Sequence, residues 1–224
     1  MAGKRSYGDP CGIARALDVL GERWALLVVR ELVLGPKRFT DLRAHLPGIA
    51  TDVLTQRLRQ LEQAGILRPA PLPPPAAGQV YELTDRGRDL EPVLHALGRW
   101  GSQEEFQGVT HDMTVDAFAV ALATVFESTK AQGLDTTLAL VVDGDPLVLT
   151  IRSGTLQVRR GAADQADARI AVSVATLREL LWRGCPLAEA EADGSITVDG
   201  SRTVVRQFLK LFPPPVSRRR DKNA

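Results

Sequence analysis

Two short amphipathic segments on either side of Pro47–Gly48 restrict the folds that the first half of the chain can adopt. The upstream segment, KRFTDLRAHL, places an aromatic ring and two leucines on one helical side. In the downstream segment, TDVLTQRLRQLEQAG, leucines recur at i, i+4 and i+7 and form a single apolar stripe. Because Pro-Gly stops a helix and the connection Pro47–Ala50 is short, the two helices must lie close together. A helix-turn-helix requires this arrangement.

The side of the downstream helix opposite its leucines carries amides, hydroxyls and arginine, whereas Glu and Lys usually dominate a solvated face. Such side chains can present paired donors and acceptors to base edges in a DNA major groove. A helix that merely prefers neutral polar residues is the alternative interpretation. The residues predicted to contact DNA are Thr51, Asp52, Thr55, Gln56, Arg57, Arg59 and Gln60, with Lys37 and Arg38 from the upstream segment.

These residues are expected to divide the work of binding between bases and phosphates. Gln56 and Arg59 are predicted to read bases. Arg57 lies beside the apolar stripe, so it can extend toward the DNA backbone more easily than toward base edges. Together with Lys37 and Arg38, it is therefore predicted to position phosphates.

Helices and a hairpin complete the first half. CGIARALDVLG predicts a helix that ends at Gly21, and RWALLVVRELVLG predicts a central buried helix that ends at Gly35. After Gly65 the pattern changes to a short strand, a Pro-rich excursion and a second strand around Gln79–Leu83, which together predict a two-stranded wing. Thr84 is then expected to cap a helix over DRGRDLEPVLHALGRWGSQ.

That last helix presents an apolar stripe that nothing else in the first half can cover. Symmetric dimers are the commonest oligomers, so the stripe predicts a dimer interface, to which the Ile13–Leu20 helix could contribute. Coverage by the second half of the chain is the alternative. The stripe consists of Leu90, Val93, Leu94, Leu97 and Trp100.

Composition and length exclude several classes of protein. The 224 residues suffice for one large domain or two of about 100 residues each. The net charge of +1 conceals 14 Lys and Arg against 11 Asp and Glu in residues 1–102, and 14 against 16 in residues 103–224. No apolar run could span a membrane, and the start lacks the apolar core of a signal peptide. Only two cysteines are present, which suits the cytoplasm and excludes a disulfide framework.

The second half predicts an α+β domain over residues 113–213. TVDAFAVALATVFESTKAQG reads as an amphipathic helix of about five turns. Strands are expected in TTLALVVDG, PLVLTIRSG, TLQVRRG, ARIAVSV and SITVDG, and helices in TLRELLWRG and SRTVVRQFLKLF. Consecutive strands between terminal helices indicate an α+β layer. Residues 214–224 are expected to be a disordered basic tail, in which Arg218–Arg220 either touch DNA or stay solvated.

From about Cys11 to Trp100 the chain resembles the HxlR-type winged-helix transcription regulators, a branch of the MarR-like group. The resemblance rests on CGIARALDVLGERWALLVVRELVLGPKRF, LPGI…VLTQRLRQLEQAGIL and VYELTDRGRDLEPVLHALGRWG. It implies a dimer on an inverted-repeat DNA operator, with the Thr51–Ala64 helix in the major groove and the Arg68–Leu83 hairpin beside it. Some relatives sense oxidants through a cysteine that matches Cys11, while a small apolar interface residue is the other interpretation.

Two departures from the family pattern affect the expected DNA contacts. Ala50 occupies the usual cap position, so the cap is expected to pass to Thr51 or Asp52. Asp52 also stands where the family usually has a basic residue, and it either caps the helix or accepts from a cytosine amino group. The wing carries no charge between Arg68 and Glu82, so weak wing contacts are expected.

From about Met113 to Pro213 the second half resembles a sterol carrier protein type two-like domain. The resemblance rests on PLVLTIRSGTLQVRRG, ADARIAVSVATLRELLWRG and GSITVDGSRTVVRQFLKLF. It implies an apolar cavity for a lipid-like ligand, although the same side chains could instead form a closed core. The predicted wall consists of Phe118, Leu122, Phe126, Leu180, Trp182, Phe208 and Phe212.

Both halves together predict a dimeric DNA-binding transcription regulator in the cytoplasm, a repressor modulated by a lipophilic small molecule. A carrier of hydrophobic ligands with secondary DNA binding is the rival, as is a redox-sensing regulator acting through Cys11. The sequence shows no phosphate-binding loop, no nucleophile elbow and no metal-ligand spacing among its histidines and cysteines. We therefore expect no enzyme activity, no metal, no cofactor and no membrane partner.

Overall fold

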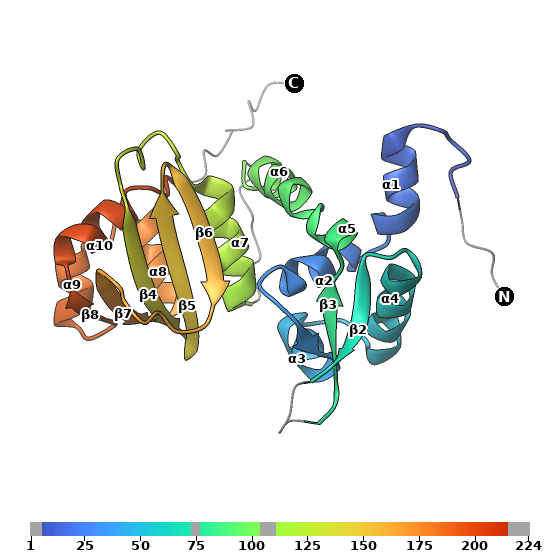
Figure 1. Ribbon diagram of the computed structural model, residues 1–224, viewed down its shortest axis with the longest axis horizontal. Coiled ribbons are helices and arrows are strands. Elements are labelled where there is room, and N and C mark those ends of the chain that lie inside the picture. The colour runs from blue at the N-terminus through green and yellow to red at the C-terminus, as the bar shows by residue number, and fades with distance from the viewer. Residues whose placement is uncertain (1–5, 73–76, 104–110, 215–224) are drawn as a thin grey trace, which may run out of the picture. The chain divides into compact units, whose positions relative to one another are not determined.

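The computed structural model describes residues 6–72, 77–103 and 111–214 (Figure 1). The chain divides into two compact units, Met1–Leu94 and His95–Ala224. The Pro-rich wing tip at residues 73–76 and the basic tail at residues 215–224 lie outside the described residues, so their predictions stay predictions. Within the described ranges, no helix is both long and apolar enough to cross a membrane.

The first unit is built from short helices and a small sheet. Its elements are α1 (Gly12–Leu20), α2 (Ala25–Leu32), β1 (Lys37–Arg38), α3 (Phe39–His45), α4 (Thr51–Gln63), β2 (Leu67–Pro71), β3 (Gln79–Leu83), α5 (Asp85–Arg88) and the start of α6 (Glu91–Gly101). The α2 helix is the central one, as predicted, because its Ala25, Val28 and Val29 are fully buried. The helix-turn-helix of α3 and α4 and the wing of β2 and β3 confirm the predicted winged-helix architecture.

The wing sheet has three strands in the order β1-β3-β2, not the two that were predicted. Lys37 and Arg38 pair with Tyr81 and Val80 of β3. Two residues are too few to show an alternating hydrophobic pattern, which explains why the sequence did not reveal β1.

The helix predicted to follow Thr84 is interrupted. The Thr84 hydroxyl accepts from the Gly87 N–H, which confirms the predicted cap, but α5 ends at Arg88 and α6 starts at Glu91. Pro92 explains the interruption, since proline has no N–H and its ring clashes with the carbonyl four residues earlier. The single helix predicted here is therefore two separate helices, α5 and α6.

The second unit is an α+β domain around a five-stranded sheet. Its elements are α7 (Val115–Val125), β4 (Thr136–Val142), β5 (Asp145–Arg152), β6 (Thr155–Arg160), β7 (Ala168–Val172), α8 (Val174–Trp182), α9 (Leu187–Ala192), β8 (Ile196–Gly200) and α10 (Arg202–Leu209). The strand order is β6-β5-β4-β7-β8, with β4 and β7 parallel and the other pairs antiparallel. Figure 1 shows α7 and α8 behind the sheet.

Two helices of this unit differ from the sequence prediction. The α7 helix is 11 residues long, shorter than the predicted five turns, and most of its residues are buried, so it is not amphipathic. The short α9 helix, LAEAEA, was not predicted, because six residues of alternating acidic and small side chains show no apolar stripe.

Asp167 and Gly200 stabilise one end of the five-stranded sheet. The Asp167 carboxylate accepts from the Thr136 hydroxyl and the Thr137 N–H, each at 2.8 Å. These hydrogen bonds stabilise the charged form and lower the pKa of Asp167. Gly200 has φ +94°, and a Cβ there would lie 2.7 Å from the Asp167 carbonyl oxygen. Strands β4, β7 and β8 are therefore held together at one corner.

Candidate nucleic-acid interface

The α4 helix buries its leucines and leaves its polar side exposed. Leu54, Leu58 and Leu61 belong to the core of the first unit, where they pack with residues of α2 and α3. On the opposite side lies an open hollow of about 710 Å³. It is lined by Thr51, Asp52, Thr55, Gln56, Arg59, Gln60 and Gln63. The structure thus brings together, on one surface, all the predicted α4 contacts except Arg57.

The start of α4 corrects the predicted cap. Ala50 is the N-cap residue, and no side chain caps the helix there. Asp52 instead lies in the first turn, where a carboxylate interacts favourably with the helix dipole. The Thr55 hydroxyl donates to the Thr51 carbonyl oxygen at 2.8 Å, so its hydrogen is used within the helix.

Two of the three predicted phosphate contacts are buried in this structure. Arg57 is only 6% exposed, and its guanidinium donates to Gln60 Oε1 and, at 3.4 Å, to Glu22 Oε2. Lys37, in β1, is 7% exposed. Of the three residues predicted to contact phosphates, only Arg38 has a solvent-exposed side chain. The predicted roles of Arg57 and Lys37 are revised accordingly, since a phosphate cannot reach a covered cation.

The wing lies next to α4. Hydrogen bonds hold it at its base, and its strands β2 and β3 carry no net charge. Arg68 Nε and Glu82 Oε1 form an ion pair at 2.7 Å across β2 and β3. At the base of the wing, the Thr84 hydroxyl donates to the carbonyl oxygens of Gly65 and Ile66 at 2.6 and 3.1 Å. The end of α4 is thereby fixed to the wing, while the charges of β2 and β3, Arg68 and Glu82, neutralise each other.

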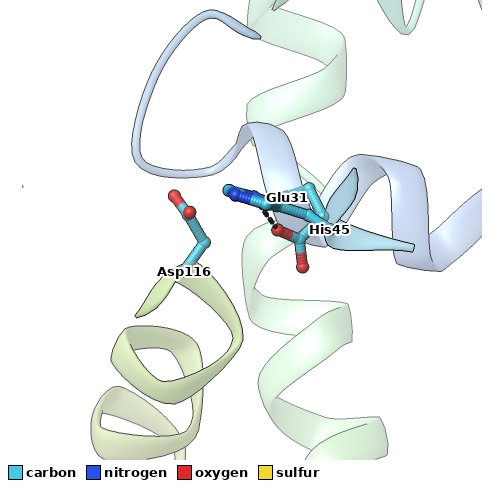
Figure 2. Close-up of side chains that lie close together, drawn as sticks. All are labelled: Glu31, His45 and Asp116. Atoms are coloured by element: carbon cyan, nitrogen blue, oxygen red, sulfur yellow. Dashed lines mark hydrogen bonds and ion pairs between the residues drawn. The ribbon is translucent and has the colours of Figure 1, made fainter. Parts of the chain in front are cut away.

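A buried carboxylate joins α2 to the helix that precedes the turn. Glu31 is fully buried, and its Oε2 lies 3.1 Å from His45 Nδ1 in the last turn of α3 (Figure 2). Its Oε1 accepts from Arg30 Nη2 at 2.8 Å. Asp116, also drawn in Figure 2, belongs to the second unit, where its Oδ2 accepts from Arg160 Nη2 at 2.6 Å. The Glu31 contacts fix α3, and with it the entry to the turn.

The α6 stripe separates into a buried and an exposed part. Leu94 is buried and belongs to the core of the first unit, and Leu90 packs partly against that core. This position corrects the prediction that Leu94 faces a partner. Val93, Leu97 and Trp100 are exposed, Trp100 to 68%. Their i, i+4, i+7 spacing forms one uncovered apolar stripe on α6.

The α1 helix is likewise uncovered on its apolar side. It contains no buried residue, and Ile13 and Leu17 are exposed. Cys11, the redox candidate, is an exposed free thiol at the N-cap of α1.

Relatives of known class match this winged-helix unit. The family model described as HxlR-like helix-turn-helix matches residues 19–107. An uncharacterized HTH-type transcriptional regulator of Synechocystis sp. is 43% identical over 95 residues, which cover 42% of this chain and 70% of the relative. The chain belongs to the HxlR-like helix-turn-helix family. This HxlR-family protein is a DNA-binding transcription regulator with a winged helix-turn-helix, as the resemblance implied.

A second relative is the HTH-type transcriptional regulator YodB of Bacillus subtilis, 35% identical over 88 residues, or 39% of this chain and 79% of YodB. The solved structure of quinone-bound YodB covers 41% of this chain and 96% of that chain at 32% identity and a TM-score of 0.36.

The second half of this HxlR-family protein matches a different family model, described as alkyl sulfatase C-terminal, over residues 101–218. The structure of the stereoselective inverting sec-alkylsulfatase Pisa1 from Pseudomonas sp. is 30% identical, with a TM-score of 0.43. It covers 45% of this chain, but this chain covers only 16% of Pisa1. The α+β class predicted for this half is confirmed by the sheet and its helices, and the sterol carrier resemblance stays a prediction.

The predicted ligand-wall residues of this half lie in two aromatic groups. Phe118 and Trp182 have ring centroids 5.7 Å apart. Phe212 lies 5.8 Å from Phe126 and 4.9 Å from Phe208. Phe118, Phe208 and Phe212 are buried, as are Leu122 and Leu180. These rings pack against each other, which is the arrangement of a core.

Proposed function

We propose that this regulator binds an inverted-repeat operator as a homodimer and reads its bases with the exposed polar face of α4. The hollow lined by seven polar α4 side chains is the observation that carries the proposal. Within that face, Gln56 and Arg59 are exposed and can present paired hydrogen-bonding groups to a base edge. Arg38 is the exposed cation that holds the DNA backbone beside them.

Replacing one base-reading arginine tests this assignment. Arg59→Ala should relax specificity at one base pair per half-site, at a cost of about 1–3 kcal/mol in binding free energy. Arg206→Ala in α10 removes an exposed charge elsewhere and serves as the matched control. Binding is measured by fluorescence anisotropy on the duplex upstream of the gene and on its single-base variants. Unchanged discrimination in Arg59→Ala contradicts the assignment, and micromolar, sequence-independent binding by the wild type favours the carrier function.

The dimer is proposed to form through the uncovered stripe of α6 and the uncovered side of α1. A two-fold dimer of winged-helix units places its recognition helices about one DNA turn, ~34 Å, apart. Leu97→Glu should yield monomers in sedimentation and abolish operator binding. Val141→Glu, at an apolar position of β4 with similar exposure, is the control. Retained dimerisation in Leu97→Glu places the interface elsewhere.

The second unit is proposed to sense a lipophilic small molecule that releases the repressor from DNA. Trp182 Nε1 supports this proposal, because it is buried and has no hydrogen-bond partner within the described part of the chain. A ligand that supplies an acceptor to this indole would gain a hydrogen bond beside the buried Phe118 ring. To change DNA affinity, the ligand must bind the DNA-competent and incompetent states differently.

A ligand panel tests the sensor. Medium-chain fatty acids and fatty alcohols are titrated into the full chain while thermal stability and operator affinity are recorded. A ligand that raises the melting temperature of the wild type, but less that of Trp182→Phe, supports the site. If no compound of the panel changes either quantity, the domain is structural.

Redox control through Cys11 is the second candidate. It is favoured by the exposure of this thiol at the start of α1 and by the relationship to YodB, of which a quinone-bound structure is known. Diamide should then abolish operator binding by the wild type and leave Cys11→Ser unaffected. Equal loss in both proteins excludes the redox role.

We propose no enzyme activity for the chain. The match of its second half to the alkyl sulfatase C-terminal family makes alkyl sulfate hydrolysis the reaction to test. Release of sulfate from dodecyl sulfate by the purified chain would contradict the proposal.

A further inference from the structure

The buried Arg57 connects the recognition helix to the turn that follows α1. Its Nη1 donates to Gln60 Oε1, one helical turn further along α4. Its Nη2 lies 3.4 Å from Glu22 Oε2, in the turn between α1 and α2. Since Arg57 is only 6% exposed, packing and the Glu22 carboxylate together hold the guanidinium in place.

This contact determines which way the Gln60 amide is turned. A guanidinium has only N–H donors, so the Gln60 atom that faces it must be the carbonyl oxygen. The assignment of Oε1 and Nε2 therefore follows from chemistry. Gln60 also lines the hollow on the outer side of α4, and with its oxygen accepting from Arg57, its NH₂ group is the part that has no hydrogen-bond partner among the described residues.

Gln56 lies one turn earlier on the same surface and is not constrained in this way. Its side chain is exposed, and it makes no hydrogen bond within the described ranges. Gln56 can therefore present both an acceptor and a donor, the pair that adenine N6 and N7 require. The two glutamines of one helix face thus differ in what they can offer a base.

We propose that Arg57 is a positioning residue for base specificity, which turns the Gln60 amide so that Gln60 only donates to DNA. This inference rests on the proposed function of α4. Guanine offers two acceptors, N7 and O6, in the major groove, whereas adenine places its N6 donor beside N7. Gln60 therefore favours guanine over adenine, and the Glu22–Arg57 pair sets that preference without contacting DNA.

Selection from a library of randomised duplexes tests the inference with the full chain. Gln60→Met identifies the base position that Gln60 reads, because only that preference disappears. At that position the wild type should prefer guanine to adenine by about ten-fold. In Arg57→Met the freed amide can rotate, and the preference should fall to within about two-fold. Arg57→Lys keeps a donor toward Gln60 and should retain the ranking of the wild type.

The alternative outcomes are distinct. A purely structural role for Arg57 predicts that Arg57→Met weakens binding to all sequences alike and keeps guanine preferred, which overturns the inference. If Arg57→Met does not fold, the Gln60→Met variant tests the inference instead. The inference is overturned when Gln60→Met selects the same sequences as the wild type. Failure of the wild type to enrich any sequence refutes the proposed function itself, whatever the variants do.

Discussion

Thr84 joins three elements of the winged-helix unit, and replacing its hydroxyl by a methyl group should loosen all of them. The hydroxyl oxygen accepts from the Gly87 N–H at 3.1 Å and caps α5. Its hydrogen is directed to the carbonyl oxygens of Gly65 and Ile66, just beyond α4. Thr84→Val keeps the shape of the side chain and removes both functions.

The cost follows from these contacts. Loss of an N-cap typically costs about 1 kcal/mol. Gly87 is buried, so its N–H cannot turn to water, and an unsatisfied buried group costs about 1–3 kcal/mol. The lost bond to Gly65 adds about 1 kcal/mol. The cap and the bond to the Gly87 N–H are the same hydrogen bond, so the first two costs overlap. We therefore expect the local free energy of unfolding to fall by about 2–4 kcal/mol, which corresponds to roughly 30- to 800-fold faster exchange of the protected amides.

Hydrogen exchange followed by mass spectrometry measures this change without requiring the two units to unfold together. Peptides that contain Gly65, Ile66 and Gly87 should exchange faster in Thr84→Val, while peptides of the second unit stay unchanged. The matched control is Thr40→Val, which removes only an exposed hydroxyl contact of 3.3 Å to Asp41. Equal exchange in the two variants would refute the role assigned to Thr84.

Two further predictions concern the second unit. Gly200→Ala should lower the free energy of unfolding by about 1–3 kcal/mol, because φ is +94° and the Cβ would meet the Asp167 oxygen. In chemical denaturation, Gly144→Ala should cost less, since its φ is also positive but its surroundings are open. The folded-state pKa of Asp167 is lowered, so its contribution to stability is present above the unfolded pKa of about 3.9 and is lost as the pH falls through the folded pKa. Thermal melts at decreasing pH should therefore show a weaker acid dependence in Asp167→Asn, and equal dependence contradicts this linkage.

Periodicity predicted most of the fold because long apolar patterns determine which face of an element is buried. The leucine stripe of α4 and the strands of the second unit are of this kind. The interruption at Pro92 could have been predicted from the same sequence, since proline cannot continue a helix. The two-residue strand β1 could not, because its pairing with Tyr81 depends on contacts distant in sequence.

Helical periodicity also predicted which side of α4 is polar and exposed, but it did not predict that Arg57 is buried. In the sequence, Arg57 is one more basic residue beside the apolar stripe. Its guanidinium contacts Glu22, 35 positions earlier, and no local pattern indicates that contact. The burial of Leu94 could not be predicted either. The apolar stripe on α6 does not reveal which of its leucines pack into the core of the first unit.

The central claim is that this protein regulates transcription by binding a specific DNA sequence. Measuring the sequence selectivity of DNA binding by the full chain tests that claim most directly. Anisotropy titrations should compare the duplex upstream of the gene with a scrambled duplex of equal composition at two salt concentrations. We predict affinity for the upstream duplex at least about 10³-fold higher than for the scrambled one, with the preference retained at the higher salt. Equal, strongly salt-dependent affinity for both duplexes would contradict the account.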